Sequence, residues 1–376
     1  MLQIKFFFQK AKKILLESNI LLILSIFILF LGFSARIKEM SIYESGGDDR
    51  VHQDAVLTFL DGNSPYDFTV EGFENLDEDT STEKGYAYFP AILYIYTILY
   101  KISQIFLNGP YIMHLFYRLP GVLAHLFVGI LLIKYFYSQK KPDKLAMFYT
   151  VFYWTFDYFF LARSSLARFD ALPVLFLFLA VSNLQKSDIK AGIFFSISVL
   201  FKTFSVILFP LFIFKSKKPL KFLFWGFLTA FIFSLPFITS WDNLVTYIHG
   251  ALFVHSERYV QGRPFLYYLS YLFSLELIQI ISFNFYSIGS IVFGWVFLVI
   301  NKIGKFFEDN FTISIFPFLI FYLITPVLNR TFLLWWIPFL LVGSYNFFKG
   351  KWKFCFYLVT GLMLSLIHIS EPTRPY

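Results

Sequence analysis

The sequence predicts an all-α protein: a polytopic bundle of transmembrane helices with a large first extracytoplasmic loop that carries juxtamembrane helices. Two features of the composition indicate this class, since 57% of the residues are hydrophobic and only 15% are charged. Such a chain lacks the polar residues that cover a soluble globule, and apolar runs such as 20–33 and 222–237 suit the hydrocarbon core of a bilayer. Basic residues gather in short loops beside these runs, as is typical of cytoplasmic loops.

The first apolar run, 20–33, follows a lysine-rich N-terminus and has no small-residue cleavage site after it. We therefore expect an uncleaved anchor in the cell membrane with a cytoplasmic N-terminus. The first outer loop, 36–110, is then extracytoplasmic, and it holds 13 of the 24 acidic residues. Its apolar run 88–107 is interrupted by Lys101 and Gln104, which favours a juxtamembrane helix in the outer interface over a full crossing.

The apolar run 191–214 lies between two basic loops that both belong on the cytoplasmic side. Its 24 positions would span roughly 36 Å as one helix, which is enough for one crossing of the bilayer and too short for two. A hairpin of two short helices satisfies the charge distribution, with its tip near Lys202. Irregular backbone at that depth is tolerated where it is buried in protein or lines a polar cavity.

The remaining crossings follow from the same alternation of charge, and a second outer loop covers 240–276. We expect residues 1–363 to form a single transmembrane domain. Residues 364–376 resemble the translation of a sequencing adapter, so we expect a non-native tail on a truncated C-terminus. The other predicted crossing helices are 112–136, 145–161, 171–184, 222–237, 277–300, 311–328 and 332–347.

The net charge does not point to a nucleic-acid-binding protein, and the cysteine content excludes a disulfide. The net charge of +8 arises from the basic loops beside the apolar runs, so it does not indicate a nucleic-acid partner. Cys355 is the single cysteine, and an intrachain disulfide is therefore impossible.

Several motifs follow one another along the chain in an order that resembles the GT-C membrane glycosyltransferases. The likeness is closest to the family 87 mannosyltransferases that use polyprenol-phosphate-mannose, and the Ser-Pro-Tyr element is also similar to that of the GPI mannosyltransferase I type. The resemblance covers nearly the whole chain. Its residues are Asp48, Arg50-Val51, Asp54-Ala55, Gly62, Ser64-Pro65-Tyr66-Asp67, Tyr88-Phe89-Pro90, Arg168-Phe169-Asp170-Ala171-Leu172-Pro173, Ala191-Gly192, Lys202-Thr203, Pro210 and Asn329-Arg330-Thr331-Phe332-Leu333-Leu334-Trp335.

The resemblance implies transfer of a sugar, with mannose as the first candidate, from a polyprenyl-phosphate carrier. The acceptor is a hydroxyl group of a glycolipid, glycan or protein outside the membrane, and the transfer usually proceeds with inversion. Inversion by direct displacement needs a general base and an electropositive seat for the departing phosphate. In the family the catalytic Asp lies seven positions before a small residue that begins the Ala-rich helix, which points to Asp48, with Asp49 as the alternative. Either carboxylate could instead cap the helix that starts near Arg50.

Lys202 is the first candidate for the phosphate seat. A lysine within an apolar segment costs roughly 2.5–3.5 kcal/mol on insertion scales, so it needs a polar cavity or a partner unless it snorkels to the interface. Arg330 could bind the phosphate or anchor the chain at the interface, and Arg258 is a further phosphate candidate. His255 and Arg263 in the second outer loop are candidates for substrate contact. Arg168 and Asp170 could form a structural ion pair or line the acceptor path.

We expect no metal and no cofactor, because the six histidines show no ligand spacing and no second acidic cluster accompanies Asp48 and Asp49. Two alternative functions stay open. The long loop 240–276 is compatible with a lipid-linked polysaccharide polymerase or ligase. A secondary transporter would show related halves with paired broken helices, whereas this sequence has one broken element, at Lys202.

Overall fold

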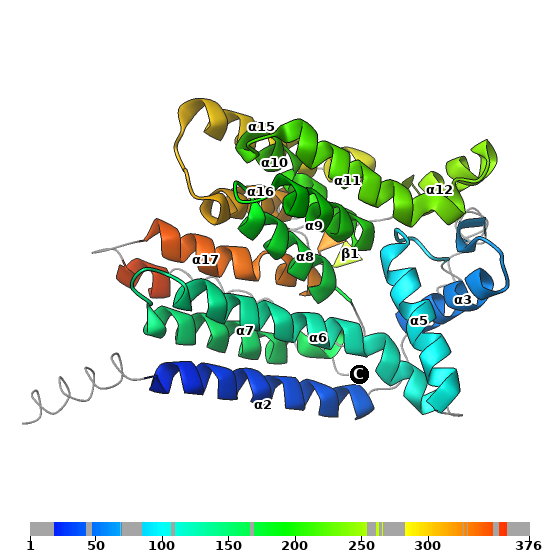
Figure 1. Ribbon diagram of the computed structural model, residues 1–376, viewed down its shortest axis with the longest axis horizontal. Coiled ribbons are helices and arrows are strands. Elements are labelled where there is room, and N and C mark those ends of the chain that lie inside the picture. Colours follow the sequence, from blue (N-terminus) through cyan, green and yellow to red (C-terminus); the bar gives the residue numbers. More distant parts are fainter. Residues whose placement is uncertain are drawn as a thin grey trace, which may run out of the picture.

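The computed structural model describes residues 19–42, 47–67, 69, 85–106, 110–165, 169–253, 261–262, 265, 283–325, 327–328, 330–348 and 353–358, and for some helical residues among them it describes the backbone alone. The described part of the chain is helical, as predicted, apart from one pair of two-residue strands (Figure 1). In chain order its elements are α2 (Ile20–Ile42), α3 (Gly47–Leu60), α5 (Ala91–Phe106), α6 (Pro110–Tyr137), α7 (Lys144–Ser165), α8 (Ala171–Asn183), α9 (Asp188–Phe201), η1 (Thr203–Leu208), α10 (Phe209–Lys215), α11 (Pro219–Ser234), η2 (Leu235–Phe237), α12 (Trp241–Leu252), β1 (Gln261–Gly262), α15 (Phe283–Gly304), α16 (Asn310–Ile324), β2 (Val327–Leu328), η4 (Arg330–Trp335) and α17 (Ile337–Phe347).

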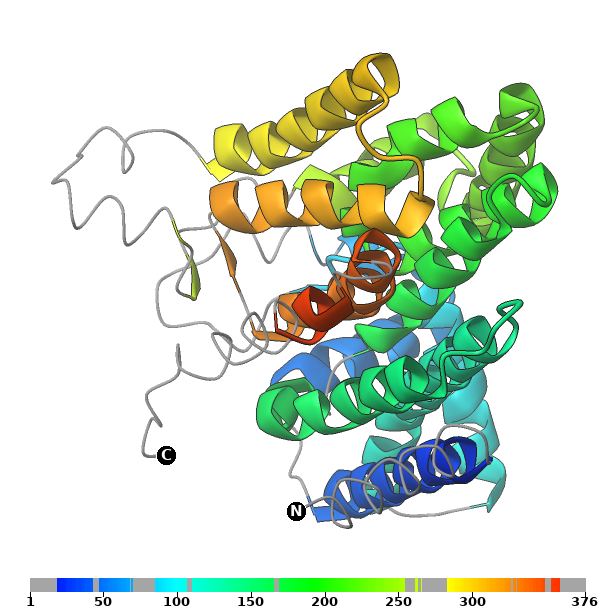
Figure 2. The same ribbon diagram turned by 90° about the vertical axis from the view of Figure 1, so that its left-hand side faces the viewer.

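Among the described residues, three helices are long and apolar enough to cross a membrane: Ile20–Met40, Tyr117–Tyr137 and Pro219–Phe237. The prediction of a helical protein with membrane-spanning capacity is thus confirmed, while the number of crossings and their orientation stay predictions. Shorter apolar helices make up much of the rest of the bundle. Figures 1 and 2 show α15 and α16 side by side at the edge of the molecule opposite α2.

The centre of the bundle lies where α6, α8, α16 and α17 meet, and aromatic residues fill it. Phe178 and Phe339 are almost fully buried, and their ring centroids lie 6.0 Å apart. Phe311 packs on Phe178 with a centroid distance of 5.0 Å. Full burial of one such side chain contributes roughly 1.5–3 kcal/mol relative to water, so this cluster holds the helices in fixed positions.

The predicted hairpin is present, and its tip lies at Lys202. This residue has an extended backbone, with φ −160° and ψ 131°, between the end of α9 and the start of η1. The chain then returns antiparallel to α9: the Phe195 and Phe212 ring centroids are 4.7 Å apart, and the Ser198 and Ser205 hydroxyl oxygens are 2.6 Å apart. The prediction of a hairpin with its turn near Lys202 is therefore confirmed.

The side chain of Asp188 ties the two ends of the hairpin together. Its carboxylate oxygens accept hydrogen bonds from the backbone N–H groups of Lys217 (3.2 Å) and Lys218 (3.0 Å), just before α11 begins. Unpaired N–H groups at a helix start favour a nearby carboxylate. Asp188 thus closes the base of the hairpin. The tip of the hairpin, at Lys202, points to the opposite end of the bundle.

α9 packs closely against α8 on one side and α11 on the other. The Ser198 hydroxyl donates a hydrogen bond to the backbone oxygen of Pro173 at 2.7 Å, which fixes α9 against the start of α8. On the side of α11, a Cβ atom added at Gly192 would lie 2.4 Å from the backbone oxygen of Phe222. The two backbones therefore approach more closely than any side chain at position 192 would allow.

Most basic loops gather at one end of the bundle, on the left in Figure 1. There Lys144 Nζ donates to Asn19 Oδ1 at 3.2 Å, and Lys353 forms an ion pair with Asp143. Lys215 Nζ donates to the backbone oxygen of Glu308 at 3.0 Å. These contacts join loops that the sequence assigned to a common side of the membrane, which we call the basic end.

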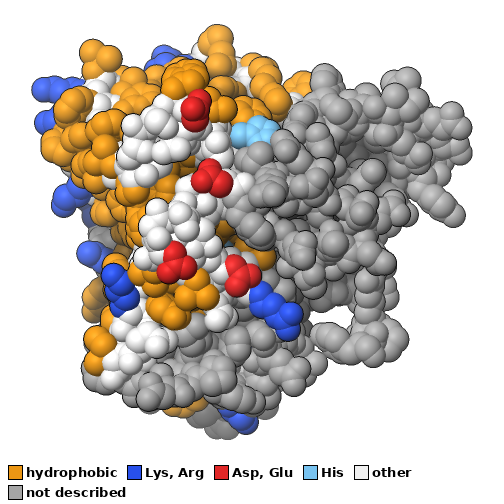
Figure 3. Space-filling view, turned by 90° about the vertical axis from the view of Figure 1, so that its right-hand side faces the viewer, with side chains coloured by type: hydrophobic (Ala, Val, Ile, Leu, Met, Phe, Trp, Pro, Cys, Tyr) orange, Lys and Arg blue, Asp and Glu red, His pale blue; other side chains and the backbone are white. Residues whose placement is uncertain are grey.

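The opposite end carries α3, α5 and α12, on the right in Figure 1. Figure 3 views the molecule from this side, and acidic side chains are scattered over the described part of its surface. Among them Asp54, Asp61 and Asp67 are exposed. The first outer loop predicted from the sequence lies here, so we call it the acidic end. Whether α5 lies in the membrane interface stays a prediction.

A cluster of tyrosines holds the acidic end together. The Tyr66 hydroxyl donates to the backbone oxygen of Tyr88 at 2.8 Å, and its ring centroid lies 5.8 Å from that of Tyr86 and 4.9 Å from that of Tyr247. Burial, together with the neighbouring Tyr86 and Tyr247, raises the pKa of the Tyr66 phenol well above its ordinary value of 10.0. The Ser64-Pro65-Tyr66 element thus anchors the first outer loop to α12.

Tyr66→Phe is expected to lower the free energy of unfolding by about 1 kcal/mol at pH 8, because the hydrogen bond to Tyr88 is lost. A folded-state pKa raised above the unfolded value stabilises the fold fully below pH 10, and this contribution falls as the pH rises further. The difference between wild type and variant should therefore shrink above pH 10. Thermal unfolding in detergent across this range measures it, with exposed Tyr137→Phe as the control, and a difference that grows with pH would contradict the assignment.

Candidate functional site

The predicted hairpin tip carries a buried ion pair. Lys202 Nζ lies 2.6 Å from Asp170 Oδ1, and the two side chains are 16% and 2% exposed. Asp170 directly precedes α8, yet its carboxylate makes no capping hydrogen bond to that helix. The antiparallel packing of α8 and α9 brings the start of one helix beside the end of the other, and this places the carboxylate against the lysine.

The indole of Trp335 also binds this carboxylate. Its Nε1–H donates to Asp170 Oδ1 at 2.6 Å, so the same oxygen accepts hydrogen bonds from both Lys202 and Trp335. The second oxygen, Oδ2, is buried and has no hydrogen-bond partner among the described residues. A buried carboxylate oxygen with no donor is costly, and such groups are found where a ligand or water binds.

Aromatic rings surround the ammonium group of Lys202. Its Nζ lies 5.8 Å from the ring centroid of Phe169, 5.2 Å from that of Phe332 and 5.1 Å from that of Trp335. Phe204 stacks on Trp335 with a centroid distance of 4.0 Å and holds the indole in place. Cations within about 6 Å of such rings are attracted by the ring quadrupole. The Lys202 charge is therefore balanced by a carboxylate and by cation–π contacts.

Phe169 connects this pair to the first outer loop. Its ring centroid is 5.5 Å from the imidazole of His52 in α3 and 5.2 Å from the ring of Tyr88. His52 is buried and stacks on Tyr88 with a centroid distance of 5.4 Å. Phe169 and Lys202 thus link His52 and Tyr88 of the first outer loop to the late loop at Trp335.

Two short strands join the second outer loop to the late loop. β1 and β2 pair in parallel, with Gln261 opposite Val327 and Gly262 opposite Leu328. These strands could not be predicted from the sequence, because two residues are too few to show an alternating pattern. Their pairing brings the backbone next to Arg263 close to the backbone that leads to Arg330.

Among the predicted site residues, the structure brings Lys202 and Asp170 together. The described partners of Asp170 are Lys202 and Trp335. Arg168 lies outside the described residues, so its predicted pairing with Asp170 stays a prediction. His255, Arg258 and Arg263 also lie outside them. For Arg330, the first residue of η4, only the backbone is described.

Asp48 and Asp49 lie in the first turn of α3, which begins at Gly47 and not near Arg50 as expected. Both therefore follow the position at which a residue caps the helix, and acidic residues in a first turn are favoured by the helix dipole. Their side chains are outside the description, so the choice between base and capping residue stays open.

Sequence reasoning missed Phe169, Phe332 and Trp335 as neighbours of Lys202. All three lie within the quoted motifs, yet their aromatic side chains alone gave no reason to assign them a role in a chain with 54 phenylalanines. In the part of the chain that the structure describes, no three His, Cys, Asp or Glu side chains gather as metal ligands would.

Comparisons of this chain with protein-family models, with curated proteins and with solved structures gave no match.

Proposed function

We propose that this protein is a membrane glycosyltransferase. It transfers a sugar, with mannose as the first candidate, from a polyprenyl-phosphate carrier to a glycolipid, glycan or protein hydroxyl on the extracytoplasmic side, with inversion. The observation that supports this proposal is the meeting of the first outer loop, the Phe169-Asp170 segment, the hairpin tip and the late loop around Lys202. The resemblance noted in the sequence supplies the type of reaction.

In the proposed reaction the acceptor hydroxyl oxygen attacks the anomeric carbon of the bound sugar. Asp48, or Asp49 in its place, takes the hydroxyl proton as the new glycosidic bond forms. The bond between the anomeric carbon and the phosphate oxygen breaks, and its electron pair leaves with the polyprenyl phosphate. Lys202 and Arg330, with Arg258 as a further candidate, stabilise the negative charge of the departing phosphate.

The ion pair with Asp170 is compatible with this role for Lys202. A lysine ammonium has three N–H donors and can contact more than one acceptor at a time, and one of its contacts here is Asp170. A donor phosphate would thus share the ammonium with the carboxylate. Asp170 would also keep the lysine oriented before the donor arrives, so that less reorganisation accompanies binding.

The direct test is sugar transfer from synthetic polyprenyl-phosphate-mannose by the full chain in membranes. Asp48→Asn is expected to lower the transfer rate roughly 10²- to 10⁴-fold, because the proton acceptor is lost. Asp61→Asn is the matched control, since Asp61 is an exposed acid just after the same helix, and it should keep wild-type activity.

Two outcomes would contradict the proposal in different ways. Full transfer by both Asp48→Asn and Asp49→Asn would remove the assigned base. Transfer from a nucleotide sugar, with none from the lipid-linked donor, would remove the assigned donor.

A further inference from the structure

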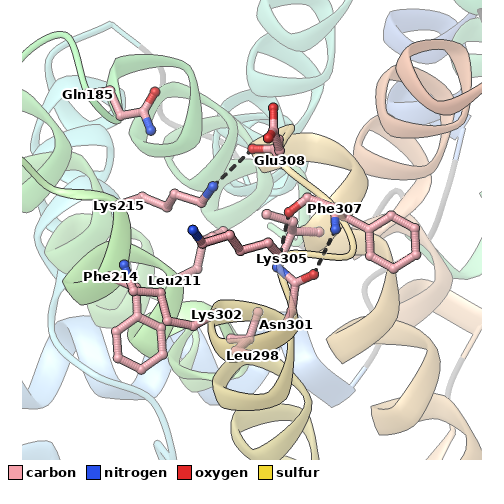
Figure 4. Close-up of a pocket in the computed structure, with 11 residues that line it drawn as sticks. Gln185, Leu211, Phe214, Lys215, Leu298, Asn301, Lys302, Lys305, Phe307 and Glu308 are labelled. Atoms are coloured by element: carbon pink, nitrogen blue, oxygen red, sulfur yellow. Dashed lines mark hydrogen bonds between the residues drawn. The ribbon is translucent and has the colours of Figure 1, made fainter.

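A second group of cations lies at the basic end, on the far side of the molecule from Lys202. Here α10, the end of α15 and the connection to α16 enclose a pocket of about 360 Å³. Lys215, Lys302 and Lys305 line it together with Gln185, Asn301 and Glu308. In Figure 4, Lys215 and Lys305 reach into the pocket from opposite walls.

The charge of this pocket is unbalanced. Three lysines stand against the single carboxylate of Glu308, and none of the three forms an ion pair with a carboxylate in the described part of the chain. Lys215 binds the backbone oxygen of Glu308, not its carboxylate. Ammonium groups that face one cavity repel each other, and a bound anion would relieve the repulsion.

The walls of the pocket are held rigidly. Asn301 is buried at its base, where its Nδ2 donates to the Phe307 backbone oxygen at 3.2 Å and its Oδ1 accepts from the Phe307 N–H at 2.9 Å. These two bonds fix the turn that carries Lys305. The backbone position of Lys305 in the wall of the pocket is therefore fixed.

The backbone of this pocket is also strained in two places. Among the described residues, Gln185 (φ 68°) and Lys305 (φ 51°) are the two non-glycine residues with positive φ, and both line it. Glycine or asparagine usually occupies such a position after a helix end. Strained backbone conformations of this kind are common at binding sites, where the side chain contributes to binding although the backbone conformation lowers the stability of the fold. Position 305 therefore has a lysine because its charge is needed there, and not because lysine suits the positive φ.

An exposed apolar surface adjoins the pocket. Ile303 is 77% exposed and Phe306 is 66% exposed, and both flank Lys305 in the sequence. Ile300, one turn earlier on α15, is half-exposed as well. A ligand that suits this combination carries an anionic head beside hydrocarbon chains. We propose that the pocket binds the phosphate headgroup of an anionic phospholipid, whose acyl chains lie along the exposed face of α15.

Competition between phosphatidylglycerol and phosphatidylcholine for the purified full chain in detergent, followed by native mass spectrometry, tests this proposal. Wild type is expected to prefer phosphatidylglycerol. The double variant Lys302→Gln/Lys305→Asn should lose this preference roughly thirtyfold, since each of the two lysines near an anionic headgroup contributes about 1 kcal/mol. Asparagine tolerates positive φ, so the backbone at 305 is preserved.

Lys140→Gln/Lys141→Gln is the matched control, because it removes the same charge from an exposed loop at the basic end and outside the pocket. It should keep the wild-type preference. Equal losses in both double variants would overturn the proposal in favour of diffuse surface charge. If wild type binds phosphatidylglycerol and phosphatidylcholine equally well, that measurement alone would overturn the proposal. Inorganic phosphate that competes as well as phosphatidylglycerol would overturn the assignment to a lipid.

Discussion

Replacing Lys202 by methionine is expected to lower the free energy of unfolding by about 3–5 kcal/mol. The substitution preserves the volume of the side chain and leaves the buried carboxylate of Asp170 without its cation. Trp335 still donates to Asp170 Oδ1, but an indole N–H does not balance a full negative charge. Thermal unfolding of the purified protein in detergent measures the loss, and a variant as stable as wild type would show that the pair contributes nothing to the fold.

The double variant Lys202→Met/Asp170→Asn separates the structural role of this pair from its proposed role in catalysis. It removes both charges, and asparagine keeps an oxygen that accepts the hydrogen bond from Trp335. Since neutral replacement of a buried ion pair is often neutral or stabilising, most of the stability should return. Sugar transfer should stay low if Lys202 binds the donor phosphate. A stable double variant with wild-type transfer would restrict Lys202 to a structural role.

Gly192→Ala is expected to lower the free energy of unfolding by about 1–3 kcal/mol. The new Cβ would lie 2.4 Å from the Phe222 backbone oxygen and 3.2 Å from the Gly226 nitrogen. Backbone atoms cannot rotate away as a side chain can, so α9 and α11 would have to separate. The same thermal unfolding assay in detergent measures this effect.

Gly226→Ala supplies the matched control on the facing helix. Its Cβ would meet the Gly192 backbone oxygen at 3.5 Å, an ordinary van der Waals distance. Alanine also favours a helix by up to about 1 kcal/mol over glycine, so this variant should be as stable as wild type or more stable. Equal destabilisation by the two substitutions would contradict the close approach at Gly192.

The helical class and the hairpin could be predicted from the sequence because both depend on local properties. An apolar run too short for two crossings, between two basic loops, requires a turn, and the lysine within it marks the turn. The structure has the turn at Lys202. Local reasoning of this kind needs only residue type, spacing and the thickness of a bilayer.

The partner of Lys202 could not be predicted in the same way. Asp170 lies 32 positions earlier and Trp335 lies 165 positions after Asp170, so their contact depends on how α8, α9 and η4 pack. Closeness in sequence suggested a pair of Asp170 with Arg168, which lies outside the described residues, whereas nothing local indicated the contact of Asp170 with the neighbouring hairpin. The pocket at Lys305 was missed for a related reason. Lys215 and Lys302 lie in the last turns of α10 and α15 and not in loops, and nothing local showed that the three lysines face one cavity.

The closed base of the hairpin has a consequence for the synthesis of the protein. In the predicted orientation both ends of the hairpin stay on one side of the membrane, so no hydrophilic segment between its two halves has to be translocated. Lys202 is then the charged residue within the hairpin that enters the bilayer. Asp170 leaves the ribosome before Lys202, so the counterion is already present when the lysine arrives.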